Sequence, residues 1–273
     1  MDSKEYAGVD LAHDADGVPV VTYGWGKLYA SERGGSTWDR TVVQPAARND
    51  VTSLRLDPFG NLGVAYRAQG AGSGLKFARR VNGSWEVELA ASWGARYMAL
   101  AYDGAGNPAI AYSSDPDGDG WISAINLARW TGSGWDTELV EEGPVGYGVF
   151  AALAFDPLTG LPLLMHRGDG TARVYEWDGA AWVAEDLEPG GGYVSGCALA
   201  FEPDEGTAYA AWSKNGQLKL ATRAPGSGVW EVELVDPDPA SAFHLPMKLG
   251  PDGRLYIVYR GGGGIRIASK SIL

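Results

Sequence analysis

The chain of 273 residues contains a single cysteine and only three histidines. One cysteine excludes an internal disulfide, and Cys197, in the apolar stretch CALAF, is expected to be a small core residue. The histidines are widely separated, without an H-x-H or H-x-x-x-H pair, so the sequence does not predict a shared metal ion. It also contains no nucleophile-elbow motif, P-loop or dinucleotide-binding glycine motif, and no catalytic residue is therefore assigned.

Basic residues are scarce, with 22 Lys and Arg against 34 Asp and Glu and a formal net charge of −12. This excess of acid argues against nucleic-acid partners and anionic membrane surfaces, because both need clustered basic residues. No run of about 18 apolar residues is present, so we expect no membrane insertion. The start, MDSKEYAG, lacks the apolar core of a signal peptide, and secretion or export to a periplasm would require a signal removed beforehand.

Glycine and tryptophan are abundant, with 40 and 11 residues, and they mark an internal repeat. Five tryptophans recur at separations of 47, 50, 47 and 48 residues, and an acidic marker precedes an aromatic marker by 9 or 10 residues in each unit that has both. Three markers in constant register predict a repeat architecture. They are Trp38, Trp85, Trp135, Trp182 and Trp230; the acidic Asp14, Asp57, Asp103, Asp156 and Glu202, with Gly250 in the sixth unit; and the aromatic Tyr23, Tyr66, Tyr112, His166, Trp212 and Tyr259.

Each unit contains four short stretches typical of strands, which in the second unit are Thr52–Leu56, Gly63–Arg67, Leu75–Arg79 and Trp85–Leu89. Six such units predict an all-β, six-bladed propeller of four-stranded antiparallel blades in a single domain, residues 1–273. The last blade lacks its tryptophan strand and is expected to be three-stranded, so its edge is open to self-pairing or to a missing segment. The predicted blades span residues 5–43, 51–90, 97–140, 150–187, 195–235 and 243–272.

The stretch SERGGSTW, from Ser31 to Trp38, resembles the Asp box S-x-D-x-G-x-T-W of sialidase-type propellers, with Arg33 in place of the aspartate. The whole chain is similar to bacterial six-bladed propellers of this loosely related kind. In that family the Asp box serves folding, so the resemblance implies architecture rather than chemistry. Sialidases also use three arginines to hold a carboxylate, together with a tyrosine nucleophile, a glutamate and an aspartate acid, and no spacing here singles out such a tyrosine–glutamate pair.

Arginines are expected at the face where the variable loops into each first strand meet the loops after each second strand. Arg67, Arg167 and Arg260 follow the aromatic marker in alternate units and, with Arg96, suit a carboxylate. The alternative is that each arginine packs on an aromatic ring or pairs with an acid. His166 replaces a tyrosine and is either a functional histidine or a packed substitute for that ring. The variable loops are residues 44–51, 90–97, 141–150, 188–196 and 236–245, whereas the turns between first and second strands are expected to be structural.

Aromatic residues in these loops can stack on sugar rings or, alternatively, cap the core. The sequence therefore predicts a non-catalytic, lectin-like propeller that binds a carbohydrate or small anionic ligand at the mouth of the central channel. The first alternative is a glycan-active hydrolase or lyase at the same face, with His166 and an acid as the acid–base pair. The second is a structural or interaction domain of a larger secreted protein. The aromatic candidates are Trp25, Trp93, Trp121, Tyr147 and Tyr193.

The loop DPDGDG carries three alternating carboxylates, Asp115, Asp117 and Asp119, which fit D-x-D-x-D-G. Alternating carboxylates in a tight loop can point at one hard cation, so calcium is the one cofactor that the sequence suggests. Ser123 and Asn126 stand where a further acid would complete the site, which lowers the expected affinity. The alternative is a solvated acidic turn.

Overall fold

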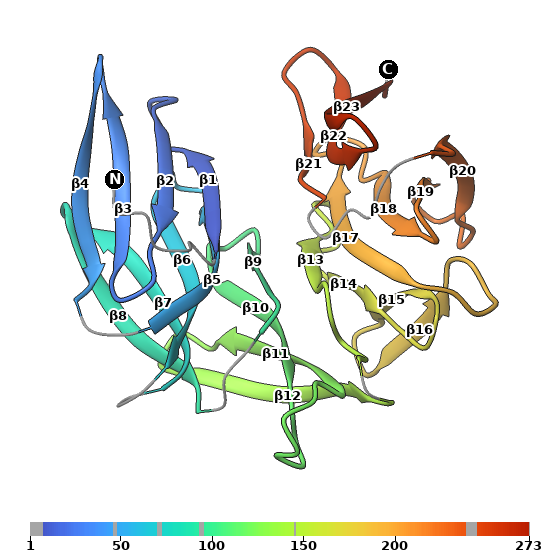
Figure 1. Cartoon of the computed structure of the whole chain (residues 1–273), viewed down its shortest axis with the longest axis horizontal. Coiled ribbons are helices and arrows are strands. Elements are labelled where there is room, and N and C mark those ends of the chain that lie inside the picture. The colour runs from blue at the N-terminus through green and yellow to red at the C-terminus, as the bar shows by residue number, and fades with distance from the viewer. Residues whose placement is uncertain are drawn as a thin grey trace. The chain divides into compact units, whose positions relative to one another are not determined.

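The computed structural model describes residues 8–45, 48–69, 73–92, 96–144, 146–238 and 245–272, with only the backbone of residues 48–50 and 69. The regular elements of these residues are strands in six antiparallel sheets, five with four strands and the last with three. These sheets are the blades of a six-bladed propeller, as the repeat predicts. Figure 1 labels the strands of each sheet. No helix in the described part of the chain is long and apolar enough to cross a membrane.

The chain divides into two compact units, Met1–Pro116 with Asn126–Val140 and Asp117–Ile125 with Glu141–Leu273, which we describe separately. Each blade uses consecutive strands of the chain. Those of blades 1 to 3 are β1 (Val9–His13), β2 (Pro19–Tyr23), β3 (Leu28–Gly34), β4 (Thr37–Gln44), β5 (Arg48–Leu56), β6 (Leu62–Gln69), β7 (Gly74–Val81), β8 (Ser84–Ala91), β9 (Met98–Tyr102), β10 (Pro108–Ser114), β11 (Ala124–Trp130) and β12 (Trp135–Glu142). Those of blades 4 to 6 are β13 (Ala152–Phe155), β14 (Pro162–Arg167), β15 (Ala172–Trp177), β16 (Trp182–Asp186), β17 (Val194–Phe201), β18 (Ala208–Lys214), β19 (Gln217–Arg223), β20 (Glu231–Asp236), β21 (Met247–Leu249), β22 (Arg254–Gly261) and β23 (Gly264–Ser271).

Several strands extend into the loops that the sequence predicts as irregular, among them β17, which begins at Val194 inside the predicted loop 188–196. The largest difference is at β5. β5 begins at Arg48, inside the stretch 44–51 that the sequence predicts as an irregular loop, so that prediction is wrong at its C-terminal end. A shift in register between Asn49 and Thr52 lets β5 continue its pairing with β6 to Gln69. A bulge of this kind inserts a residue into one strand without ending the sheet, and the alternation of apolar residues does not reveal it.

The acidic marker at the end of each first strand builds the hairpin turn that follows it. In blade 2, Asp57 Oδ1 accepts the backbone N–H groups of Phe59 at 2.9 Å and Asn61 at 2.7 Å. Such a side chain replaces the partners that the turn backbone would otherwise lack, which explains why an acid recurs there. The equivalent acids that accept backbone N–H groups are Asp14, Asp103, Asp156 and Glu202.

Three of the repeated tryptophans, those of blades 2, 3 and 5, pack between consecutive blades, whereas Trp38 of blade 1 is 50% exposed. Trp85 of β8 lies against a core cluster that contains Ala30 of blade 1 and Ala78 of its own third strand. The indole therefore fills the space between a small residue of its own blade and the third strand of the blade before it. The equivalent groups are Trp135 with Phe77 and Ala128, and Trp230 with Val174 and Ala221.

In blades 2, 5 and 6 the aromatic marker of the second strand hydrogen-bonds to the preceding blade. Tyr259 Oη donates to Asp236 Oδ2 at 2.8 Å, and Arg266 Nη1 donates to the same oxygen at 2.8 Å. We call this combination the inter-blade latch: a second-strand marker, a third-strand cation and the acid six residues after the tryptophan of the preceding blade. Between blades 4 and 5 the latch consists of Trp212, Lys219 and Glu188.

Candidate functional site

His166, the histidine that the sequence selects, is fully buried in β14 at 0% exposure. Its Nδ1 donates to the carbonyl oxygen of Arg167 at 2.7 Å, and its ring stacks on Tyr175 with centroids 5.4 Å apart. Tyr147 contacts the same imidazole edge-on, with centroids 5.0 Å apart. Burial lowers the pKa of His166 from 6.5 to about 4, so the imidazole is neutral near neutral pH.

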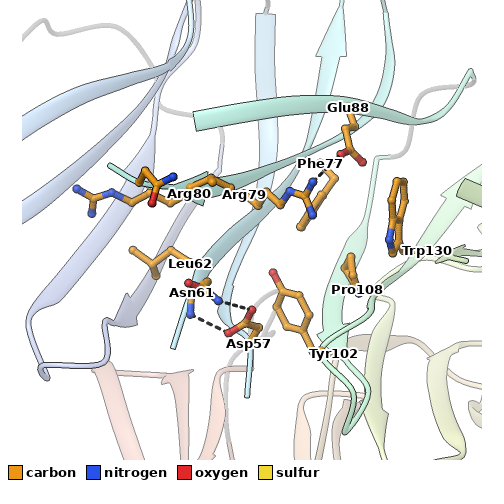
Figure 2. Close-up of a pocket in the computed structure, with 13 residues that line it drawn as sticks. Asp57, Asn61, Leu62, Phe77, Arg79, Arg80, Glu88, Tyr102, Pro108 and Trp130 are labelled. Carbon is orange, nitrogen blue, oxygen red and sulfur yellow. Dashed lines mark hydrogen bonds and ion pairs between the residues drawn. The ribbon is translucent and has the colours of Figure 1, made fainter. Parts of the chain in front are cut away.

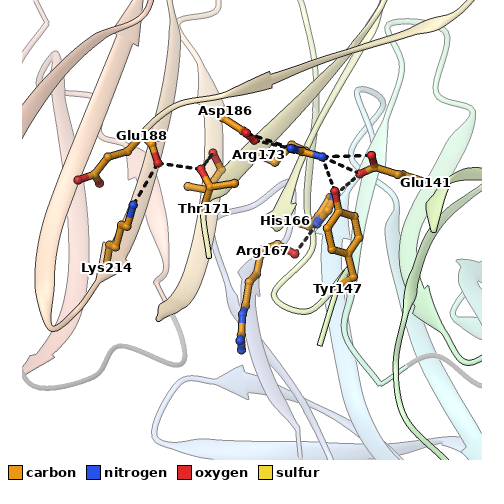
Figure 3. Close-up of polar contacts among 10 residues, drawn as sticks. Glu141, Tyr147, His166, Arg167, Thr171, Arg173, Asp186, Glu188 and Lys214 are labelled. Carbon is orange, nitrogen blue, oxygen red and sulfur yellow. Dashed lines mark hydrogen bonds and ion pairs between the residues drawn. The ribbon is translucent and has the colours of Figure 1, made fainter. Parts of the chain in front are cut away.

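The Arg173 guanidinium hydrogen-bonds to two acids near this ring, Asp186 and Glu141 (Figure 3). Its Nε donates to Asp186 Oδ1 at 2.6 Å and its Nη2 to Asp186 Oδ2 at 2.9 Å, a two-point ion pair. Its Nη1 reaches Glu141 Oε1 at 3.1 Å and also contacts the Tyr147 hydroxyl. Burial, followed by the hydrogen bond with Glu141, raises the pKa of the Tyr147 phenol.

This cluster is a third copy of the inter-blade latch. Glu141 stands six residues after Trp135, as Asp236 stands six after Trp230, and His166 and Arg173 take the places of the marker and the cation. His166 Nε2 lies 4.0 Å from Glu141 Oε2 and has no hydrogen-bond partner among the described residues. Because the arrangement recurs between blades 4 and 5 and blades 5 and 6, packing of blades accounts for it. The signal that sequence reasoning missed is the acid at a constant six residues after three of the tryptophans.

The predicted arginines fall into separate groups. Arg167 Cζ lies 4.8 Å above the ring of Tyr193, which is 45% exposed, so these two predicted residues are brought together. Arg67 has a pKa lowered by burial and then by the charge of Arg96, so these two predicted arginines lie near enough for their charges to interact. Arg67 belongs to the first unit, whereas Arg167 and the exposed Arg260 belong to the second, and the predicted three-arginine cluster stays a prediction.

The predicted aromatic residues differ in exposure. Trp25 and Trp121 are 36% and 60% exposed, whereas Tyr147 is buried at 4%. Tyr147 therefore packs inside the latch and does not present its ring to solvent. Trp93 lies outside the described residues.

The acidic loop holds its carboxylates close together, because ligand oxygens of Asp115, Asp117 and Asp119 lie within 4.8 Å of one another. The last two are exposed, and Asp119 Oδ1 accepts the backbone N–H of Trp121 at 2.8 Å. Exposed acidic turns commonly show this geometry without a cation, so the calcium site stays a prediction.

A pocket of about 300 Å³ lies in the first unit between blades 2 and 3. Arg79 and Glu88 line it from the third and fourth strands of blade 2, and Tyr102 and Trp130 line it from blade 3 (Figure 2). Phe77, almost fully buried, contributes its ring edge-on to Tyr102 at 6.5 Å. Several lining residues come from the turns between first and second strands, which the sequence predicts as merely structural: Asp57, Asn61 and Gly106.

The charged groups of this pocket remain accessible to a ligand. Arg79 Nε lies 3.4 Å from Glu86 Oε2 and its Nη2 lies 3.6 Å from Glu88 Oε1, while the Arg79 side chain is 46% exposed. Glu88 Oε2 accepts the indole N–H of Trp135 at 3.0 Å, which fixes the carboxylate in place. Burial raises the pKa of Tyr102, so its phenol stays protonated at physiological pH.

The pocket occurs where an inter-blade ion pair is replaced. At two junctions, a basic residue near the end of one blade's third strand forms an ion pair with the preceding blade. The acid lies on the third strand of that preceding blade, one position earlier when the two strands are aligned by the repeat. The pairs are Arg80 with Glu32 between blades 1 and 2, and Arg223 with Glu176 between blades 4 and 5. Between blades 2 and 3 the same places hold Trp130 and Arg79, which cannot form an ion pair. The guanidinium is therefore left to bond within its own blade and to face the pocket.

No protein-family model matches the chain, and no curated protein matches it in sequence. Its fold is similar to that of a mutant of the Aleuria aurantia lectin in complex with Fucα1-6GlcNAc, with a TM-score of 0.62, 15% identity, and 97% of this chain and 96% of the lectin covered. An ulvan lyase, a polysaccharide lyase, gives a TM-score of 0.63 at 11% identity, covering 96% of this chain and 78% of the enzyme. A leech intramolecular trans-sialidase gives 0.62 at 10% identity, covering 99% and 68%. At these identities the likeness shows the fold alone.

Proposed function

We propose that this propeller binds a glycan, with one sugar ring seated in the pocket between blades 2 and 3. The observation that carries the proposal is the lining of that pocket, where Arg79 and Glu88 stand beside the rings of Tyr102 and Trp130. A binding pocket for a small ligand combines apolar and aromatic walls with a few placed polar groups, and this one does so.

The two charged residues complement the hydroxyl groups of a sugar. Each hydroxyl both donates and accepts hydrogen bonds, whereas the Arg79 guanidinium only donates and the ionised Glu88 carboxylate only accepts. Hydrogen bonds to ionised groups are roughly twice as strong as neutral ones. The Arg–Glu pair is close but not tightly bonded, at 3.6 Å, so the Arg79 guanidinium can turn toward a sugar hydroxyl while the fixed Glu88 carboxylate accepts from another.

The aromatic rings supply the apolar half of the site. One face of a sugar ring presents C–H groups, which pack on the π-face of Trp or Tyr. Trp130 is half-buried, and its ring is held edge-on against Trp135 with centroids 5.8 Å apart, so little ordering is needed on binding. The similar folds that bind or act on saccharides support the proposal at the level of architecture, and a fucosylated disaccharide is the first ligand to test because one of them was solved with it.

A glycan array followed by calorimetry with Fucα1-6GlcNAc and the strongest array ligand tests the proposal. Arg79→Ala and Trp130→Ala are each expected to weaken binding at least about tenfold, because each removes a major contact. Arg129→Ala is the matched control, since Arg129 occupies the equivalent place in blade 3, pairs with Glu138 at 3.0 Å and does not line the pocket. An array without binders would refute glycan binding, and binding that survives both pocket variants would refute this location.

The second candidate is the predicted loop site, favoured by the Arg167 guanidinium over the exposed Tyr193 ring. A sugar or small anion bound there would contact both residues. Tyr193→Ala would then weaken ligand binding while Arg79→Ala leaves it unchanged, which separates the two sites. Release of shorter saccharides or unsaturated ends from a bound glycan would instead favour the hydrolase or lyase alternative.

A further inference from the structure

A second groove, also of about 300 Å³, lies in the other unit between blades 5 and 6. Its walls differ from those of the pocket between blades 2 and 3, because it is lined by aliphatic side chains without an arginine or an aromatic ring among the described residues. Two charged groups, Glu233 and Lys270, stand at its rim, with Lys270 Nζ 2.6 Å from Glu233 Oε1. The other lining residues are Leu220, Leu234, Val235, Leu255, Ile257, Ala268 and Ser269.

The groove corresponds to the space that a tryptophan fills at other junctions. Ala268 is equivalent to Ala128, which shares a core cluster with Trp135, and Leu220 is equivalent to Phe77 of that cluster. Glu233 is equivalent to Glu88, the acceptor of the Trp135 indole N–H at 3.0 Å. The walls and the hydrogen-bond acceptor of a tryptophan site are thus present between blades 5 and 6, while blade 6 contributes no tryptophan from its described residues.

Among the described residues, the edge of β23 also lacks a fourth strand, the strand that carries the tryptophan in blades 1 to 4. β23 pairs with β22 along one side, and its sheet is three-stranded, whereas the third strands of the other five blades each pair with a fourth strand. In three of those blades the tryptophan pairs with the same place on the third strand. The pairs are Arg33 with Trp38, Arg80 with Trp85, and Trp177 with Trp182. The equivalent residue of β23 is Lys270, at the rim of the groove.

We propose that the edge of β23 and this groove bind a tryptophan-containing extended segment of another polypeptide. The segment adds a fourth strand to blade 6, its tryptophan pairs with Lys270, and the indole enters the groove and donates to Glu233. Backbone hydrogen bonds to this edge, which pairs with no strand among the described residues, contribute affinity, and the groove selects the side chain, as in other cases of strand addition. The aliphatic walls suit an indole and not a sugar, so this surface is distinct from the proposed glycan site.

Binding of a labelled peptide with the sequence of residues 228–236, GVWEVELVD, tests the proposal. We expect saturable binding by fluorescence anisotropy, and at least about thirtyfold weaker binding of the same peptide with alanine for tryptophan, because a buried tryptophan commonly dominates an interface. Glu233→Ala is expected to weaken binding about tenfold through loss of the charged acceptor. Glu231→Ala is the control, because Glu231 lies on the same strand, is exposed and does not line the groove.

Hydrogen exchange supplies an independent measurement. Peptide addition is expected to slow exchange of the amides of β23 and not those of β1 to β8. Ala268→Phe fills the groove and is expected to abolish binding in a protein that still unfolds cooperatively. The proposal is overturned if the alanine peptide binds as well as the tryptophan peptide, if neither binds, or if β23 amides are already protected in a dimer of this chain.

Discussion

His166 gives the sharpest test of how the latch is built. The imidazole is buried and neutral, and the groups facing it are Glu141, Arg173, Asp186 and the rings of Tyr147 and Tyr175. Replacing it by phenylalanine, in His166→Phe, keeps a ring of similar size but removes the titrating group. We predict that acidification destabilises the native protein more steeply than it destabilises this variant.

The magnitude follows from the pKa of His166, about 4 in the folded protein against 6.5 when it is free. Above pH 6.5 both states are neutral and the histidine adds no pH dependence. Below pH 6.5 the imidazole is protonated in the unfolded chain, whereas in the folded chain it stays neutral down to about pH 4. The free energy of unfolding therefore falls as the pH is lowered from 6.5 to about 4. The full loss amounts to about 3 kcal/mol, since each pKa unit corresponds to about 1.4 kcal/mol.

The measurement is urea unfolding of native protein and variant at several values between about pH 7 and about pH 4.5. Taking the difference between the two proteins removes the contributions of all ionisable groups that both proteins share. The lost hydrogen bond to the Arg167 carbonyl lowers stability of the variant by an amount that does not vary with pH, so it shifts the curve without changing its slope. His13→Gln, at an exposed position of β1, is the control. Parallel curves for native protein and His166→Phe would refute the reasoning.

Two further predictions concern the pocket between blades 2 and 3. Gly63→Ala is expected to lower the free energy of unfolding by about 1–3 kcal/mol, because its Cβ would overlap the Tyr102 hydroxyl, whereas Gly104→Ala, with open space around its Cβ, is the chemical-denaturation control. The double variant Arg79→Glu with Trp130→Arg recreates the ion pair seen at other junctions, so calorimetry should show loss of glycan binding in a chain that still unfolds cooperatively. Retained glycan binding in the double variant would contradict the assigned roles.

The fold was predictable because the sequence markers correspond to interactions that recur from blade to blade. Asp57 recurs as an acid because the turn backbone needs an acceptor at that place, and Trp85 recurs because the space between blades needs a large ring. These requirements are local or repeat with the unit, so single-sequence periodicity reports them directly. The start of β5 at Arg48 was not predictable, since the bulge that extends it leaves no pattern in the apolar residues.

The candidate site was predicted less well, because single residues were weighed within one unit at a time. His166 attracted attention as an isolated substitution, yet Glu141 and Arg173 show it to be one member of a latch that recurs at other junctions. Arg167 and Tyr193 were placed on the same face by loop topology and do meet. Arg79, in contrast, lies within a predicted third strand, and no marker in the sequence of that strand indicates a binding residue.

Function in a repeat protein of this kind is expected where two contacting positions change together. A residue type that is constant across the units keeps the blades packed. A change at one position alone leaves that packing in place, as when His166 occupies the marker position of the latch beside Glu141 and Arg173. At the junction of blades 2 and 3, the acid and the base of an inter-blade ion pair have both been replaced, by Arg79 and Trp130, and a pocket results. At the junction of blades 5 and 6, Ala268 and Glu233 keep the character of a tryptophan site without the tryptophan. Comparing paired positions across junctions therefore locates both proposed binding surfaces, whereas comparing residues along the chain finds neither.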